Sequence, residues 1–321
     1  MQTPLRIGTR GSQLALWQAR TVATRLEARG LNAELVIIKT AGDRLQSAPL
    51  SEAGGKRSFV KEIEDALLAG AVDLAVHSAK DMPALLPEGL TIAATLPRED
   101  PRDAFVLPAH AGGGDVAALL ARLPYSPRIG TSSIRRIAQL TQPFPAAVFA
   151  PIRGNVDTRL RKLDAGEYDA LVLATAGLRR LGLGDRISGI IPVNECIPAP
   201  GQGIVAIEIR AGDDRTRQAL QTVHDAAAGA ALDAERAVVA ALGGGCQLPL
   251  GALATTNGGA MTLQAVVCSP DGARVMRAHA TGPAADAQTL GERVAEELAR
   301  QGAQEILNAV RSEERTSGPA D

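Results

Sequence analysis

Short apolar runs alternate with amphipathic stretches over the first third of the chain. The apolar runs that read as strands cover residues 5–8, 33–40, 74–77 and 90–94, and helical spacing covers 12–28 and 56–69. Buried parallel strands joined by crossover helices are typical of this alternation. The pattern therefore predicts an α/β lobe over residues 1–96.

A second region repeats this plan between residue 129 and about residue 181. Ile129-Gly130-Thr131 precedes a helical stretch as Ile7-Gly8-Thr9 does, and residues 165–169 enter a strand as residues 69–73 do. Two proline-bearing segments, 97–108 and 192–203, interrupt the periodic stretches and predict chain crossings. We therefore expect two similar α/β lobes joined by a hinge.

The pattern changes again after about residue 222. A helix is expected at 233–242, strands near 249–255, 261–268 and 274–281, and a closing helix at 285–300, which together predict a small α+β domain. The expected domains are 1–96 with 201–221, then 102–197, then 222–313, and residues 314–321 are expected to form a disordered tail.

Composition narrows the function classes. The 321 residues are 45% hydrophobic and carry a net charge of −1, which argues against a general binder of nucleic acid or membranes. No apolar run approaches the roughly 20 residues of a membrane span, and no apolar leader precedes the first strand, so we expect a cytoplasmic protein. Cys196, Cys246 and Cys268 lack metal-ligand spacing, which predicts neither a disulfide framework nor a metal site.

Arginines recur where predicted strands lead into helices. The strand ends of an open α/β sheet are where ligands bind. Guanidinium groups near helix starts are suited to carboxylates or phosphates. No GxxxxGK[ST] loop is present, so we favour a polycarboxylate over a nucleotide. A solvated surface remains the alternative for any single arginine of this group, which comprises Arg10, Arg135, Arg136, Arg153, Arg159, Arg179 and Arg180.

Two further segments carry candidate chemistry. Asp81 comes directly after Lys80, just beyond a predicted strand. It is either one half of a surface ion pair or a carboxylate that moves protons and stabilises a cation. Cys246 follows three glycines after a predicted helix, so it is either a small apolar residue or a covalent attachment point. We interpret His77 as structural, and Cys196 and Cys268 as core residues.

Taken together, these segments closely resemble the hydroxymethylbilane synthase family, also called porphobilinogen deaminase. The matching stretches run in family order over nearly the whole chain, at residues 8–19, 76–83, 98–105, 130–136, 153–160 and 244–249. The chain departs from the family at Gly54-Gly55-Lys56-Arg57-Ser58-Phe59, where the family usually has Gly-Gly-Lys-Gly-Leu-Phe. This departure puts in question the binding role of Lys56 and any lid-like motion of residues 47–58.

The resemblance implies three domains, two of them similar to type II periplasmic binding proteins. It also implies a dipyrromethane cofactor joined by a thioether to Cys246, and a monomeric enzyme. Four porphobilinogens are then condensed head to tail with loss of ammonia, and water releases hydroxymethylbilane. By the same matching, Asp81 is the catalytic acid that helps ammonia leave and stabilises the azafulvenium electrophile.

The matching also assigns the remaining site residues. Those implied to bind the cofactor are Lys80, Asp81, Ser132, Ser133, Arg135 and Arg136, and those implied to bind substrate are Arg10, Ser12, Lys56, Arg153, Arg159 and Arg180.

Two rival functions belong to other classes. A two-lobed α/β body with arginines in its cleft also describes a solute-binding protein without chemistry, although the third domain and Cys246 argue against it. A cysteine hydrolase would need a histidine near Cys246, and none of the four histidines lies in a cysteine-protease motif.

Overall fold

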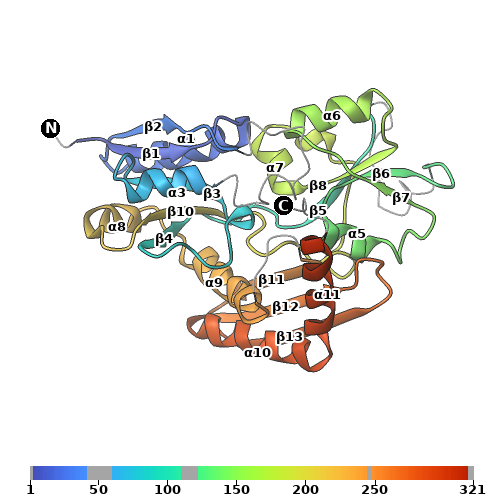
Figure 1. Ribbon diagram of the computed structural model, residues 1–321. Helices are drawn as coiled ribbons and strands as arrows, with labels where there is room; N and C mark the ends of the chain where they lie inside the picture. Colours follow the sequence, from blue (N-terminus) through green and yellow to red (C-terminus); the bar gives the residue numbers. More distant parts are fainter. Residues whose placement is uncertain (1–2, 42–59, 110–121, 244–247, 317–321) are drawn as a thin grey trace.

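The computed structural model describes residues 3–41, 60–109, 122–243 and 248–316. Within these residues the strands form two five-stranded sheets and one three-stranded sheet. Figure 1 shows the two larger sheets side by side, with the smaller sheet and its helices packed beneath them. The predicted architecture of two α/β lobes and a small α+β domain is thereby confirmed.

The first lobe is built on a sheet with the strand order β2-β1-β3-β10-β4. Strand β1 is parallel to β2 and β3, whereas β10 runs antiparallel to β3 and β4. Its strands are β1 (Leu5–Thr9), β2 (Ala33–Ile37), β3 (Leu74–Ser78), β4 (Leu90–Thr95) and β10 (Val205–Arg210). Its helices are α1 (Gln13–Glu27), α3 (Lys61–Leu68) and α8 (Asp214–Gln221).

The second lobe repeats this topology with the strand order β7-β6-β8-β5-β9. Strand β6 is parallel to β7 and β8, and β5 is antiparallel to β8 and β9. Its strands are β5 (Asp103–Val106), β6 (Arg128–Gly130), β7 (Val148–Ala150), β8 (Ala170–Ala174) and β9 (Gly189–Ile190). Its helices are α5 (Ile134–Leu140), α6 (Val156–Asp164) and α7 (Thr175–Arg180), followed by the short η3 (Gly184–Arg186).

The internal repeat seen in the sequence extends to hydrogen bonds. The Asp73 carboxylate accepts from the backbone N–H of Arg6 at 2.8 Å, and the Asp169 carboxylate accepts from the N–H of Arg128 at 2.7 Å. In both lobes the aspartate comes three residues after a glycine, Gly70 or Gly166, whose backbone is in the left-handed region. Only glycine adopts that conformation without cost. The same sequence signal therefore builds the same turn twice.

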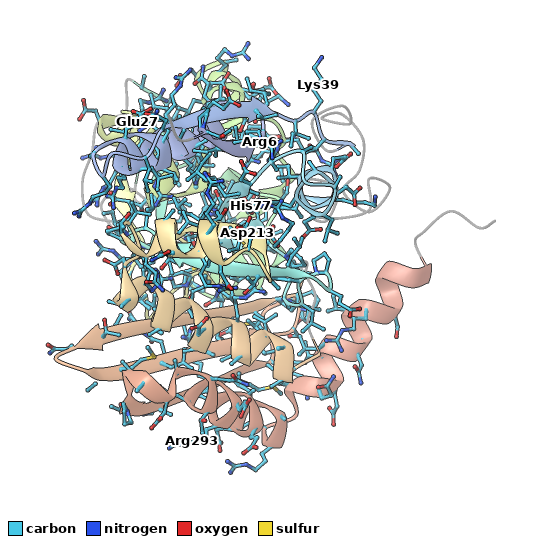
Figure 2. The ribbon with its side chains drawn as sticks, turned by 90° about the vertical axis from the view of Figure 1, so that its left-hand side faces the viewer. Arg6, Glu27, Lys39, His77, Asp213 and Arg293 are labelled. Atoms are coloured by element: carbon cyan, nitrogen blue, oxygen red, sulfur yellow. The ribbon has the colours of Figure 1, made fainter. Side chains whose placement is uncertain are left out.

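The chain crosses between the lobes twice, where the proline-bearing segments lie. One crossing joins β4 to β5 and the other joins β9 to β10, so the antiparallel strand of each lobe directly follows a crossing. Figure 2 shows His77 inside the first lobe, where its Nε2 lies 3.1 Å from Glu208 Oε2 on β10. The interpretation of His77 as a structural residue is confirmed.

The third domain packs helices α9 (Ala226–Ala241) and α10 (Ala287–Arg300) on an antiparallel sheet in the order β11-β12-β13. The strands are β11 (Leu250–Asn257), β12 (Ala260–Cys268) and β13 (Val275–Pro283), followed by the short η4 (Ala284–Asp286). Helix α9 starts earlier than expected because Asp225 caps it through Ala228 N–H at 2.8 Å. A further helix, α11 (Ala303–Thr316), extends into the segment expected to be disordered.

One buried carboxylate connects this domain to both crossings. Glu235 of α9 accepts from the Arg98 guanidinium, which lies on the first crossing, and from the Gly201 N–H at 2.6 Å, on the second. It also accepts from the Ala254 N–H of β11 at 2.8 Å. Because both of its oxygens accept hydrogen bonds, burying this charge is compensated and both crossings are tied to the third domain.

Candidate active site

The first lobe presents candidate residues just after β1 and β3. Ser12 is the N-cap of α1, and its Oγ accepts from the Ala15 N–H at 3.3 Å, while Arg10 lies between β1 and this cap. Lys80 and Asp81 lie in the short η2 helix (Ala79–Asp81) that follows β3 directly. Lys80 Nζ lies 3.4 Å from Oε1 of Gln202, on the second crossing.

Asp81 is a half-buried carboxylate without a hydrogen-bond or ion-pair partner among the described residues. Its charge nevertheless acts on Arg159 of α6 in the other lobe, since Asp81 opposes the lowering of the Arg159 pKa. The charge of an acidic side chain from the first lobe therefore acts on a cationic one from the second.

The second lobe presents serines and arginines at the end of β6. Ser132 Oγ donates to the Ile152 carbonyl at 2.8 Å and accepts from the Ile152 N–H at 3.0 Å, so it ties this loop to the end of β7. Ser133 is the N-cap residue of α5, but its side chain makes no capping bond. Arg135 and Arg136 follow in the first turn of α5, and their side chains point into the protein.

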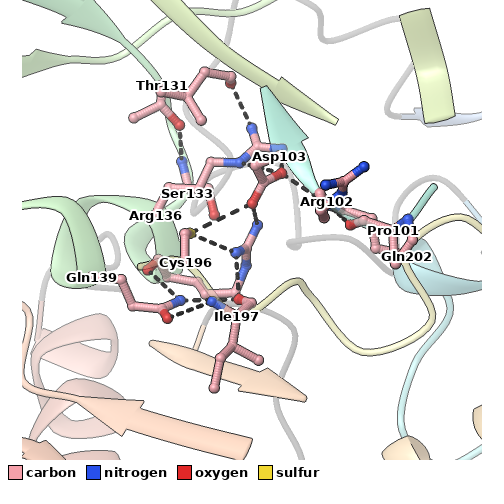
Figure 3. Close-up of polar contacts among 12 residues, drawn as sticks. Pro101, Arg102, Asp103, Thr131, Ser133, Arg136, Gln139, Cys196, Ile197 and Gln202 are labelled. Atoms are coloured by element: carbon pink, nitrogen blue, oxygen red, sulfur yellow. Dashed lines mark hydrogen bonds and ion pairs between the residues drawn. The ribbon is translucent and has the colours of Figure 1, made fainter. Parts of the chain in front are cut away.

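A buried aspartate holds these two arginines (Figure 3). Asp103, the first residue of β5, accepts from Arg135 at 2.7 Å through Oδ2 and from Arg136 at 2.7 Å through Oδ1. Gln202 Nε2 donates to the same Oδ1 at 2.9 Å. Arg135 and Arg136 are only 4% and 7% exposed, so the alternative of a solvated surface is wrong for both.

The charges in this cluster shift one another's pKa values. Burial acts to raise the pKa of Asp103, but Arg135 and Arg136 outweigh it and hold that pKa far below its usual range. Burial raises the pKa of the neighbouring Cys196 thiol to about 12, so the thiol stays protonated, with Arg135 Nη1 at 3.3 Å. Cys196 and Cys268 are both buried, which confirms that they are core residues.

Arg136 keeps donors to spare despite this pairing. A guanidinium has five N–H donors, and Arg136 uses three of them, two on Asp103 and one on the Val172 carbonyl at 2.8 Å. Arg135 Nε has no partner within the described part of the chain. Two N–H donors of Arg136 therefore have no partner among the described residues.

Other arginines reach the site without contacting an acid of the described residues. Arg159 donates to the Gly154 carbonyl at 2.8 Å; burial and the nearby Arg136 lower its pKa to about 10. Burial also lowers the pKa of Arg180 to about 10, and this arginine donates to the Gly203 carbonyl at 2.6 Å. Arg153 is half-buried beyond the end of β7. Such under-compensated cations favour an anionic ligand.

The structure adds two residues to the predicted site and leaves two predicted ones undescribed. Asp103 and Gln202 were not among the predicted site residues, although Asp103 lies inside the matched stretch 98–105 and Gln202 is a polar residue in the breaker-rich second crossing. Cys246 and Lys56, together with the segment 47–58, lie outside the described residues. Among the described helices, none combines the length and apolarity that a membrane span requires.

Comparison with protein families accounts for this arrangement. Residues 5–218 match the family model described as porphobilinogen deaminase, dipyromethane cofactor binding domain, and residues 230–300 match the model of the porphobilinogen deaminase C-terminal domain. The chain belongs to the porphobilinogen deaminase family. The first match spans both lobes and every described candidate residue, and the second covers most of the third domain.

Individual members of the porphobilinogen deaminase family are similar over nearly their full length. The porphobilinogen deaminase of Syntrophobacter fumaroxidans is 46% identical over 95% of this chain and 97% of its own. Those of Chromobacterium violaceum and Acidithiobacillus ferrooxidans are 47% and 48% identical, over 96% and 97% of this chain and 98% and 100% of theirs.

A solved structure shows a more distant similarity. A periplasmic substrate-binding protein of an ABC transporter from Coxiella burnetii is 13% identical, with a TM-score of 0.42 over 69% of this chain and 92% of its own.

Proposed function

We propose that this chain is a hydroxymethylbilane synthase. It joins four porphobilinogen molecules head to tail with loss of ammonia, on a covalently held dipyrromethane, and releases the linear tetrapyrrole by hydrolysis. Besides membership of the family, the observation that supports this most is the electrostatic interaction across the lobes between Arg159 and Asp81, an acid without a hydrogen-bond partner among the described residues.

The cationic residues fit a cofactor that carries carboxylates. Bound dipyrromethane would supply the nucleophilic terminal pyrrole to which each substrate unit is joined. Arg136 has two N–H donors left for its carboxylates, and Ser132, Ser133 and Lys80 lie at adjoining strand ends. We propose Cys246 as the covalent attachment point, since a thioether, unlike an oxygen ester, persists through repeated turnover.

The remaining arginines would orient the substrate. Each porphobilinogen carries an acetate and a propionate, and forked guanidinium groups bind such carboxylates in fixed geometry. We assign this role to Arg159 and Arg180, because burial has already removed much of their hydration. Arg10, Ser12, Arg153 and Lys56 complete the proposed substrate-binding set.

Asp81 would perform the proton and charge chemistry. As the aminomethyl C–N bond of the substrate breaks, ammonia leaves with the electron pair and positive charge develops on the remaining carbon. An ionised carboxylate beside that carbon stabilises the charge and can pass a proton between the amine and the reacting ring. Asp81 is suited to both tasks, because none of the described residues holds its oxygens.

Two measurements on the purified protein test this proposal. Incubation with porphobilinogen should release one ammonia for each substrate consumed, whereas a solute-binding protein would leave porphobilinogen intact. The intact mass should exceed the sequence mass by two pyrrole units, located by peptide mapping on Cys246, and Cys246→Ser should lack this addition and be inactive or nearly so. Active enzyme with an unmodified Cys246 would refute the attachment.

The proposed enzyme class is a transferase acting in porphyrin biosynthesis. We further propose that the protein is a cytoplasmic monomer whose partners are porphobilinogen and the growing pyrrole chain. Sedimentation analysis of the purified protein tests the oligomeric state.

A further inference from the structure

A groove of about 680 Å³ lies where helix α1 of the first lobe meets helix α7 of the second. Figure 1 shows these helices side by side, and they are in contact. Leu16, Trp17 and Leu181 give the groove an apolar floor. A groove of this size accommodates a ligand of several rings, since sites for such ligands measure about 300–1,000 Å³.

The charge of the groove has one sign. Arg20, Arg25 and Arg180 line it, and none of the described lining residues is acidic. Arg20 and Arg25 are exposed and make no ion pair with any other described residue. Three cations around an apolar floor attract a ligand with flat rings and several carboxylates.

Arg180 connects this groove with the candidate active site. Its guanidinium lies 5.5 Å from the centre of the Trp17 ring, an arrangement in which an arginine is stacked on an aromatic face. The same side chain donates to the Gly203 carbonyl on the second crossing at 2.6 Å. One residue of the proposed substrate-binding set therefore also forms the wall of the groove.

We propose that this groove receives the older pyrrole rings of the growing chain as it lengthens. The inference rests on the proposed function and adds a binding site to it. Trp17 offers a ring face for stacking, and Arg20 and Arg25 bind the acetate and propionate groups of rings that have left the strand-end site. A chain that grows by whole rings needs such a second surface, because the first site must be free for each new porphobilinogen.

The test compares wild-type holoenzyme with a double variant that carries both Arg20→Gln and Arg25→Gln. The single variant Arg29→Gln is the control. Arg29 is an exposed arginine just beyond the end of α1 and outside the groove. Holoenzyme is mixed with limiting porphobilinogen, quenched at intervals and analysed by intact mass, which separates enzymes carrying one, two, three or four added rings.

The first additions should proceed at the wild-type rate, and the last ones should be slower by about fivefold for each lost arginine–carboxylate pair. The variant should thus accumulate enzyme carrying two or three added rings, whereas Arg29→Gln should behave like wild type. Unchanged ring distributions, or equal slowing of every addition, would overturn the groove's role. Wild-type enzyme that forms no ring series at all would instead overturn the proposed function.

Discussion

The two lobes share a topology but treat charge at their strand ends differently. In the second lobe, the buried Asp103 at the start of β5 holds Arg135 and Arg136. The corresponding residue at the start of β10 in the first lobe is Val205, which is opposite Ser78 as Asp103 is opposite Ala174. The first lobe instead carries Asp81, whose carboxylate is not paired with any described residue.

This difference indicates a division of labour. A carboxylate with several donors is fixed and stays ionised, which suits it to organising neighbouring cations. A carboxylate without partners can exchange a proton and approach a developing positive charge. On the proposed function, the duplicated fold would supply two strand-end edges, one for holding anions and one for chemistry.

Removing the unpaired acid should have the largest effect on turnover. Asp81→Asn keeps the size of the side chain but removes its charge and its proton transfer, so kcat should fall by roughly 10²–10⁴-fold. Steady-state kinetics on cofactor-loaded enzyme measures this, with exposed Asp185→Asn as the matched control. Turnover within a few-fold of wild type would assign the chemistry to another group.

Removing the paired acid should affect stability instead. Asp103→Asn leaves Arg135 and Arg136 buried without a counter-charge, which should lower the free energy of unfolding by about 3–5 kcal/mol. Urea denaturation measures the loss. By the same reasoning, Arg135→Leu and Arg136→Leu should destabilise the second lobe as well as impair cofactor assembly.

Lowering the pH should remove the contribution of ionised Asp103 to the stability of the wild-type protein. Because the folded-state pKa of Asp103 is depressed, its contribution is complete above the unfolded pKa of about 4 and is lost as pH falls toward the folded value. Asp103→Asn should lack this part of the acid sensitivity. Parallel stability curves for both proteins below pH 4 would contradict the assignment.

Arg159 should separate binding from stability. Burial and Arg136 already disfavour its charge, so Arg159→Met should leave the melting temperature unchanged or raise it. The KM for porphobilinogen should rise about tenfold through the lost carboxylate contact. A lower melting temperature together with an unchanged KM would make Arg159 a structural residue.

The smallest expected difference concerns the two helix starts. Ser12 caps α1 through the Ala15 N–H, whereas the Ser133 side chain makes no capping bond in α5. Ser12→Ala should therefore cost about 1 kcal/mol of stability, and Ser133→Ala should stay within about 0.5 kcal/mol. Equal losses measured by thermal denaturation would remove this distinction.

Local sequence patterns were enough to predict the repeated lobes. Each strand-to-helix turn depends on neighbouring residues, such as Gly70 and Asp73 or Gly166 and Asp169, so the amino-acid sequence alone reveals the repeat. The arginines at strand ends were also correctly located, because strand order places them at one edge of each sheet.

The partners of those arginines could not be predicted. Asp103 lies 32 residues before Arg135, and only the antiparallel placement of β5 beside β8 brings them together. Helix α11 was missed for a related reason, since its amphipathic face is stabilised by packing on the third domain and the segment is rich in charged residues. Pairings between distant segments carry no local signal.

The return of the chain from the second lobe to supply β10 also sets an order of assembly during translation. Strand β10 lies between β3 and β4, so the first sheet stays open until residue 210 has been synthesised, whereas all strands of the second sheet lie within residues 103–190. At ribosomal speeds of about 5–20 residues per second, the first four strands wait on the order of ten seconds for β10. The lobe encoded second is thus the first that can close.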